Sequence, residues 1–221
     1  ITARFFTPFG MDYSFRKSPT LEFVHYLRAA YGDTQPFSFH GDNHQTEGAT
    51  LAVLPVQKPH PPLWMMSRDP ETLEFCAEEG INTGSFLMVP RSVFGPRYQK
   101  FIDDWNGYGH NRKPNIAYCT VIYVDDSDNK AIEVAQHRAS RAYEGLLPLN
   151  DPNDTFETRL AAQVALLESR GEPEAAALTS NLFDPDYIME HDLVFVGSPQ
   201  TVARKLRNAA EEGFFNTFMG E

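Results

Sequence analysis

Two short polar stretches carry the side chains that most often hold metal ions. His40-Gly41-Asp42-Asn43-His44 brings two imidazoles and a carboxylate close together, and Asp125-Asp126-Ser127-Asp128-Asn129 has the acidic composition of a calcium loop. The first stretch has no helical pattern to fix the spacing of its ligands, and the second lacks the glycine and the distal glutamate of a calcium loop. We therefore expect a polar turn at the first stretch, a helix-capping turn at the second, and no metal site.

A more specific segment, LPVQKPHPPLWMMSRDPET, runs from Leu54 to Thr72. Its proline-rich approach leads into a predicted buried strand, and a helix begins where that strand ends, which is where α/β proteins bind ligands. The free N–H groups of the helix start, the Thr72 hydroxyl and the neighbouring Arg68 together predict a phosphate site. In the alternative interpretation, Asp69 only caps the helix and Arg68 is solvated.

Three helices that would position this chemistry begin with a capping residue followed by proline at the first helical position. The pairs Ser18-Pro19, Asp69-Pro70 and Ser198-Pro199 predict helices over Pro19–Tyr31, Pro70–Glu79 and Pro199–Glu212, each followed by a glycine. Apolar spacing and breakers predict further helices over Tyr98–Trp105, Asn129–Leu146, Thr155–Ser169 and Pro173–Leu182.

Short apolar runs between these helices predict the strands of an α/β protein. The runs are Pro62–Met66, Ser85–Val89, Ile116–Val124 and Phe214–Met219. They do not alternate with polar residues, as is typical of strands buried on both faces of a parallel sheet. We expect four adjacent parallel strands with right-handed crossovers and helices on one side.

Four strands are half the number of a closed α/β barrel, which has eight strands and usually about 250 residues. We therefore expect the later part of a larger (β/α)8 barrel, organised as one domain over residues 1–221, and the alternative is a small open sheet that is complete as it stands. Leu147–Asp192 is too long for a simple crossover and contains several prolines. We interpret it as an insertion that forms a lid over the catalytic face, with a rigid external decoration as the alternative.

The composition of the 221 residues is that of an acidic globular protein, with 42% hydrophobic residues and a formal net charge of −11. This charge argues against nucleic acid and against an anionic membrane surface as partners. No apolar run approaches the length of a membrane span, and the first residues do not resemble a signal peptide. We expect a cytoplasmic protein in which Cys76 and Cys119 are free thiols.

Two linked motifs resemble the bacterial luciferase-like flavin-dependent monooxygenases. The first is Pro55-x-Gln57-x-Pro59-His60-Pro61-Pro62-Leu63-Trp64, followed by Ser67. The second is Val196-Gly197-Ser198-Pro199-Gln200-Thr201-Val202-Ala203, followed by Glu211-Glu212-Gly213. They occur in the order found in that family, and Phe9-Gly10-Met11-Asp12 resembles the segment that precedes them there, so the resemblance covers most of the chain.

The resemblance implies a (β/α)8 barrel that binds reduced FMN, or in some relatives a deazaflavin, at the carboxyl ends of its strands. By position in the family, the phosphate is approached by Ser67, Arg68, Asp69 and Thr72, and the isoalloxazine ring by Ser85 and Phe86. Asp69 stands where a small hydroxyl residue is often found, and a carboxylate beside a phosphate is unfavourable. The family's usual catalytic histidine belongs to earlier strands, so no catalytic residue is assigned here.

The same resemblance implies oxidation of a small organic substrate by dioxygen, with a flavin reductase as the supplier of reduced flavin. It also implies a homo-oligomer, and we expect this chain alone to be inactive. Two alternatives remain at this point. One is a non-catalytic barrel subunit or partner protein that has lost flavin binding, which Asp69 favours. The other is a phosphate-handling barrel enzyme without flavin.

Overall fold

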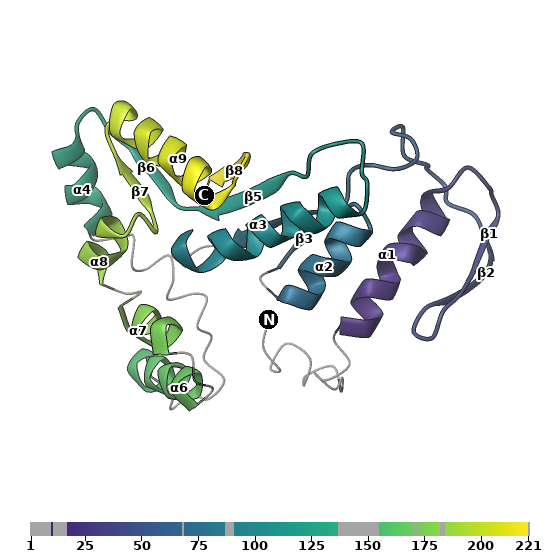
Figure 1. The fold of residues 1–221 in the computed structure, drawn as a ribbon, viewed down its shortest axis with the longest axis horizontal. Helices are drawn as coiled ribbons and strands as arrows, with labels where there is room; N and C mark the ends of the chain where they lie inside the picture. The colour runs from purple at the N-terminus through teal and green to yellow at the C-terminus, as the bar shows by residue number, and fades with distance from the viewer. Residues whose placement is uncertain are drawn as a thin grey trace. The chain divides into compact units, whose positions relative to one another are not determined.

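The computed structural model describes residues 10, 17–67, 69–86, 91–136, 155–169, 171, 173–181 and 184–220. It divides into two compact units, residues 1–63 and 64–221 (Figure 1).

The first unit packs one helix against a two-stranded antiparallel hairpin. Helix α1 (Lys17–Tyr31) precedes strands β1 (Phe37–His40) and β2 (Gln45–Ala49). The Tyr26 ring of α1 contacts the rings of Phe37 and Phe39, with centroids 5.7 and 5.6 Å apart. The hairpin was not predicted from the sequence. Ser18, expected to cap the helix, lies within it.

The turn of this hairpin is the histidine-containing stretch, and it is a polar turn as predicted. The N–H of Gly41 donates to the carbonyl of His44 at 2.9 Å. The Glu22 carboxylate of α1 accepts hydrogen bonds from three successive backbone N–H groups, those of Asp42 (3.1 Å), Asn43 (2.9 Å) and His44 (2.7 Å). Burial by itself raises the pKa of Glu22, but the hydrogen bonds from Asn43, His44 and Asp42 outweigh it, and the pKa lies below its ordinary value.

The second unit contains a four-stranded parallel sheet whose order follows the chain. Its strands are β3 (Trp64–Met66), β4 (Asn82–Phe86), β5 (Ile116–Thr120) and β8 (Thr217–Gly220). All three neighbouring pairs are parallel, so the predicted set of four adjacent parallel strands is confirmed. The predicted bounds of the second strand are wrong, because β4 begins at Asn82 rather than at Ser85; residues 87–90 lie outside the described part.

The third predicted strand is divided into two, because its halves have different partners. After β5 the chain continues as β6 (Ile122–Val124), which pairs in parallel with β7 (Phe195–Gly197) in a separate two-stranded sheet. Val121 lies at the division, and its carbonyl accepts the N–H of Phe195 at 2.9 Å. Strand β7 was not predicted, because its three residues are too few to show a strand pattern in the sequence.

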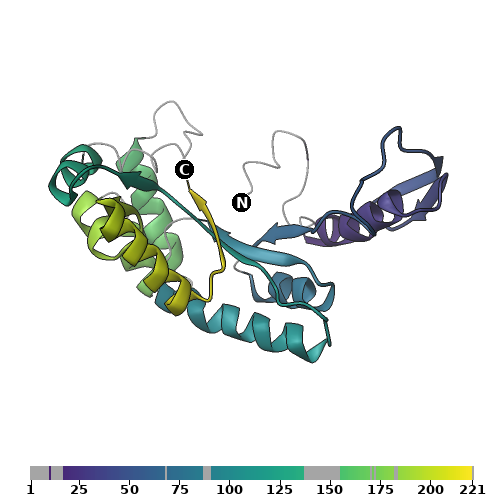
Figure 2. The same ribbon diagram turned by 90° about the horizontal axis from the view of Figure 1, so that it is seen from above.

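Three helices cover one face of the four-stranded sheet, as Figure 2 shows: α2 (Pro70–Glu78), α3 (Arg91–Gly107) and α9 (Pro199–Gly213). Helix α3 begins well before the expected Tyr98 and includes Pro96. The remaining helices are α4 (Asp128–Gln136), α6 (Phe156–Ser169), α7 (Pro173–Asn181) and α8 (Pro185–Glu190). Residues 137–146, expected to continue α4, lie outside the described part, and α8 was not predicted.

Aromatic side chains join the sheet to the covering helices. The Tyr118 ring of β5 stacks on Phe215 with centroids 4.6 Å apart, and Phe215 also meets Tyr98 of α3 edge-on at 5.7 Å. Tyr98 and Tyr118 are fully buried. This cluster fixes the helix layer against the middle of the sheet.

A second cluster lies at the amino end of β4. The indole N–H of Trp105 donates to the Arg112 carbonyl at 2.6 Å, and the Arg112 guanidinium lies 4.9 Å from the centre of the Trp105 ring. The same guanidinium donates to Oδ1 of Asn82 at 3.0 Å. Because Trp105 and Asn82 are fully buried, this network ties the end of α3 to β4.

Both cysteines are free and buried, which confirms the prediction of free thiols. Burial raises the pKa of the Cys76 thiol to about 12. None of the helices in the described part of the chain is long and apolar enough to cross a membrane.

Candidate functional site

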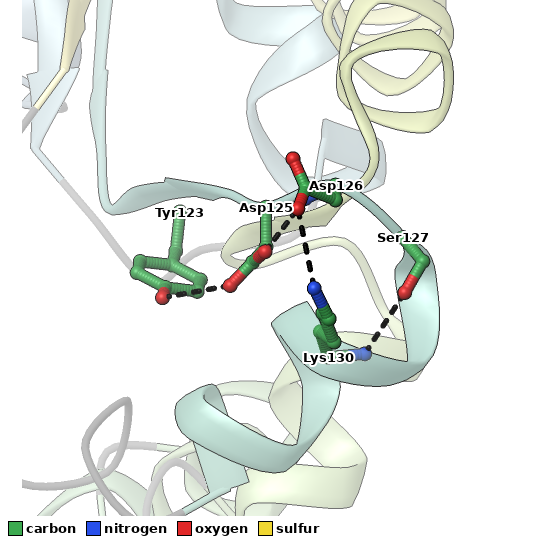
Figure 3. A network of polar contacts seen from close by, with 5 residues as sticks. All are labelled: Tyr123, Asp125, Asp126, Ser127 and Lys130. Atoms are coloured by element: carbon green, nitrogen blue, oxygen red, sulfur yellow. Dashed lines mark hydrogen bonds and ion pairs between the residues drawn. The ribbon is translucent and has the colours of Figure 1, made fainter.

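The acidic stretch after β6 is a helix-capping turn, as predicted (Figure 3). The Ser127 hydroxyl accepts the N–H of Lys130 at 3.4 Å, which caps the start of α4. The ammonium group of Lys130 pairs with Asp126 at 3.2 Å, and the Tyr123 hydroxyl donates to Asp125 at 3.3 Å. Among the residues that the structure describes, no cluster of three or more histidine, cysteine or acidic side chains is arranged to hold a metal ion.

Asp128, which follows Ser127, binds the start of α9. Its Oδ1 accepts the N–H of Ser198 at 2.6 Å, and its Oδ2 accepts the Thr201 hydroxyl at 2.9 Å. The hydrogen bonds from Ser198 and Thr201 lower the pKa of Asp128 and outweigh the effect of burial. The helix start in the second sequence motif is therefore bound to a carboxylate of the same chain.

The predicted ligand site lies at the carboxyl edge of the four-stranded sheet, where β3 ends and α2 begins. The N–H of Ser67 donates to the Gly84 carbonyl at 3.2 Å, which extends the contact of β3 with β4 beyond the strand. The Ser67 hydroxyl accepts the N–H of Asp69 at 3.1 Å, and the Ser67 carbonyl accepts the Tyr98 hydroxyl at 3.4 Å. These bonds tie the end of β3 to β4 and to α3.

Asp69 is the N-cap of α2, with φ −76° and ψ 125°. One oxygen of its carboxylate, Oδ2, accepts both the N–H of Thr72 at 3.0 Å and the Thr72 hydroxyl at 2.8 Å. Pro70 has no N–H to offer at the first helical position. The residues present therefore do not fit a flavin phosphate on the first turn of α2, because a carboxylate already accepts the N–H and hydroxyl that a phosphate would use.

The other predicted site residues belong to the neighbouring strand or are not described. Ser85 is fully buried and pairs with Tyr118, so its side chain shares the helix-covered face of the sheet. Phe86 ends β4 and pairs with Cys119 of β5. Arg68 lies outside the described residues. The structure thus brings Ser67, Asp69 and Thr72 together at one junction, with the end of β4 beside it.

The face of the sheet away from the helices carries several large apolar side chains. Register and strand alternation place Trp64, Met66 and Met219 on it, and Trp64 and Met219 are each 41% exposed. Sequence reasoning did not place these side chains on one face, although the spacing of two between Trp64 and Met66 was an available signal. It also missed Tyr98, because nothing local in the sequence relates α3 to the end of β3.

A parallel sheet in chain order, with helices on one face and a strand–helix junction at its carboxyl edge, defines an arc of a (β/α)8 barrel. The family model described as luciferase-like monooxygenase matches residues 2–216. The chain belongs to this family, and its fold is that of the later part of the barrel.

The relatives include one curated sequence and several solved structures. The chain is 27% identical over 182 residues to the oxygenase component of the flavin-dependent trigonelline monooxygenase of Acinetobacter baylyi, which covers 80% of this chain and 47% of the relative. Monooxygenase RslO1 from Streptomyces bottropensis superposes with a TM-score of 0.70 at 16% identity, over 100% of this chain and 58% of that one. EDTA monooxygenase EmoA from Chelativorans sp. BNC1 gives 0.66 at 11% identity, with the same shares covered. The chain thus spans about half the length of the relatives it matches.

Proposed function

We propose that this protein is a flavin-dependent monooxygenase that uses reduced flavin and dioxygen to oxidise a small organic substrate. The observation that carries the proposal is the family match over nearly the whole chain, together with a curated relative that is a flavin-dependent oxygenase component. The cofactor we propose is reduced FMN, with a deazaflavin as the alternative.

The proposed cofactor site is the carboxyl edge of β3 and β4, and the residues assigned to it from the family resemblance are Ser67, Arg68, Thr72, Ser85 and Phe86. A bound reduced flavin would supply the activation of dioxygen. The chain would supply a rigid edge, since Ser67 is held by Gly84, Asp69 and Tyr98. Ser85, whose side chain faces the helices, would act through the position of its backbone.

The apolar face bearing Trp64, Met66 and Met219 supports the same proposal. Apolar walls exclude water, and exclusion of water protects reactive intermediates in oxygen chemistry. Among the described positions on this face, the strands contribute no charged side chain. We therefore propose that the substrate or the flavin ring meets an apolar surface here.

We also propose that a separate flavin reductase supplies the reduced flavin to a cytoplasmic homo-oligomer. The support is that the curated relative is named as an oxygenase component. Because the chain spans about half of its relatives, we expect the 221 residues alone to be inactive. An oxygen-consumption assay with reduced FMN supplied chemically tests this, and substrate oxidation by the chain alone would contradict it.

Leu147–Asp192 is proposed to act as a lid. Its described part contains α6 and α7, which pack on each other, and an N-terminal cap in which Thr155 and Thr158 exchange hydrogen bonds of 3.0 and 3.2 Å. A lid should exchange the amide hydrogens of α6 and α7 quickly without ligand and become protected when reduced flavin binds. Slow exchange in the ligand-free protein would favour a rigid decoration instead.

A second candidate function is a barrel subunit that has lost flavin binding. The observation that favours it is the Asp69 carboxylate on the N–H and hydroxyl of Thr72. Anaerobic titration with reduced FMN and with reduced riboflavin separates the two candidates. Binding of either flavin supports the monooxygenase, and no binding of either one supports the subunit.

A further inference from the structure

The first turn of α2 is bound by a carboxylate of its own chain. Asp69 Oδ2 lies 3.0 Å from the Thr72 nitrogen and 2.8 Å from the Thr72 hydroxyl oxygen. Thr72 is 9% exposed, so these donors have little access to water. Any phosphate that used the same donors would have to displace the carboxylate or lie beside it.

We propose that Asp69 determines cofactor specificity by excluding phosphate from the start of α2, so that this protein binds flavin without using the flavin phosphate there. This inference rests on the proposed function, since it concerns the same edge of the sheet. It reverses the expectation drawn from the family resemblance, in which this helix start approaches the phosphate.

Electrostatics sets the size of the effect. Two unit charges about 4 Å apart in water repel by about 1 kcal/mol, which is about a fivefold change in affinity, and a phosphate monoester carries about −1.5 to −2 charges at neutral pH, which raises the factor above about tenfold. Removal of the Asp69 charge should therefore strengthen the binding of FMN at least about tenfold. It should leave the binding of riboflavin, which lacks the phosphate, nearly unchanged.

The experiment measures the dissociation constants of FMN and riboflavin for wild type, Asp69→Asn and Asp69→Ser by flavin fluorescence. Asparagine and serine are both good N-caps, so α2 should persist in each variant. Asp184→Asn is the matched control. Asp184 also precedes a proline at the first helical position and accepts N–H groups of its helix, from Asp186 at 2.9 Å and Tyr187 at 3.3 Å.

The measured quantity is the ratio of the riboflavin to the FMN dissociation constant. We expect a ratio near one for wild type and Asp184→Asn, and about ten or more for Asp69→Asn and Asp69→Ser. Binding of FMN by the Asp69 variants alone would support the exclusion of phosphate by Asp69 but would overturn flavin binding by the wild type, in favour of the subunit that has lost flavin binding. A high ratio in wild type, or an equal ratio in wild type and Asp69→Asn, overturns the role of Asp69 and leaves the flavin function standing. No binding of either flavin by any variant overturns both.

Discussion

Gly84 offers a sharp test of the packing at the carboxyl edge of the sheet. A Cβ at this position would lie 2.5 Å from the Ala117 carbonyl oxygen, 2.8 Å from Met66 Cε and 2.9 Å from Ala117 Cβ. The Met66 methyl can rotate away, but the carbonyl belongs to the backbone of β5, which is held on both sides by β4 and β8. Gly84→Ala must therefore displace β4 from β5.

Overpacking of this kind costs about 1–3 kcal/mol. For a protein of this size each kcal/mol lowers the melting temperature by about 2–4 °C. The measurement is urea and thermal unfolding followed by circular dichroism. Gly107→Ala is the matched control, because a Cβ at Gly107, the last residue of α3, would meet nothing within 4 Å.

A second variant locates the strain. Adding Ala117→Gly to Gly84→Ala removes the contact between the two Cβ atoms and leaves the contact with the Ala117 carbonyl. Recovery of the lost stability should therefore be partial. If Gly84→Ala were as stable as Gly107→Ala, or if Ala117→Gly restored stability fully, the close approach of β4 and β5 would be wrong.

Three further predictions concern other parts of the chain. The pKa of Glu22 in the folded protein lies below its ordinary value of 4.5, so its carboxylate stabilises the fold above that pH and loses this effect as the pH falls through the folded pKa. Glu22→Gln should therefore weaken the fall of the melting temperature at acid pH. An unchanged fall would contradict this prediction. The Cys76 thiol, with a pKa of about 12, should resist Ellman's reagent at pH 8 until urea unfolds the protein, whereas rapid labelling of the native state would count against its burial. Trp105→Phe removes the 2.6 Å hydrogen bond to the Arg112 carbonyl and should lower the free energy of unfolding in urea by about 1–3 kcal/mol. An unchanged free energy of unfolding would show that this bond does not stabilise the fold.

Local chemistry made the helix starts at Asp69-Pro70 and Ser198-Pro199 predictable. In both, the side chain of the capping residue accepts an N–H of the first turn, and proline occupies the first helical position. The hairpin of β1 and β2 had no such signal. Strand β2 is largely polar, and the turn is held by Glu22 from a different element, so the sequence around the turn does not reveal its partner.

The division of the third strand at Val121 depends on partners distant in sequence. Residues on both sides of Val121 favour a strand, but β5 pairs with β8 and β6 pairs with β7. The candidate site shows the same limit. The strand–helix junction at Ser67 was predicted from the sequence, whereas the face of the sheet on which the Ser85 side chain lies became clear only from its pairing with Tyr118.

The contacts of Asp125 and Asp128 have an evolutionary consequence. The N–H of Asp125 donates to the Gly197 carbonyl at 3.2 Å, and Asp128 accepts the N–H of Ser198 at 2.6 Å. The two ends of the segment between Asp128 and Ser198 therefore lie side by side. The entropy of closing a loop rises slowly with its length. Changes of length are therefore best tolerated between α4 and α8, because buried residues of α4, α8 and β7 pack together and keep the two ends of the segment in place.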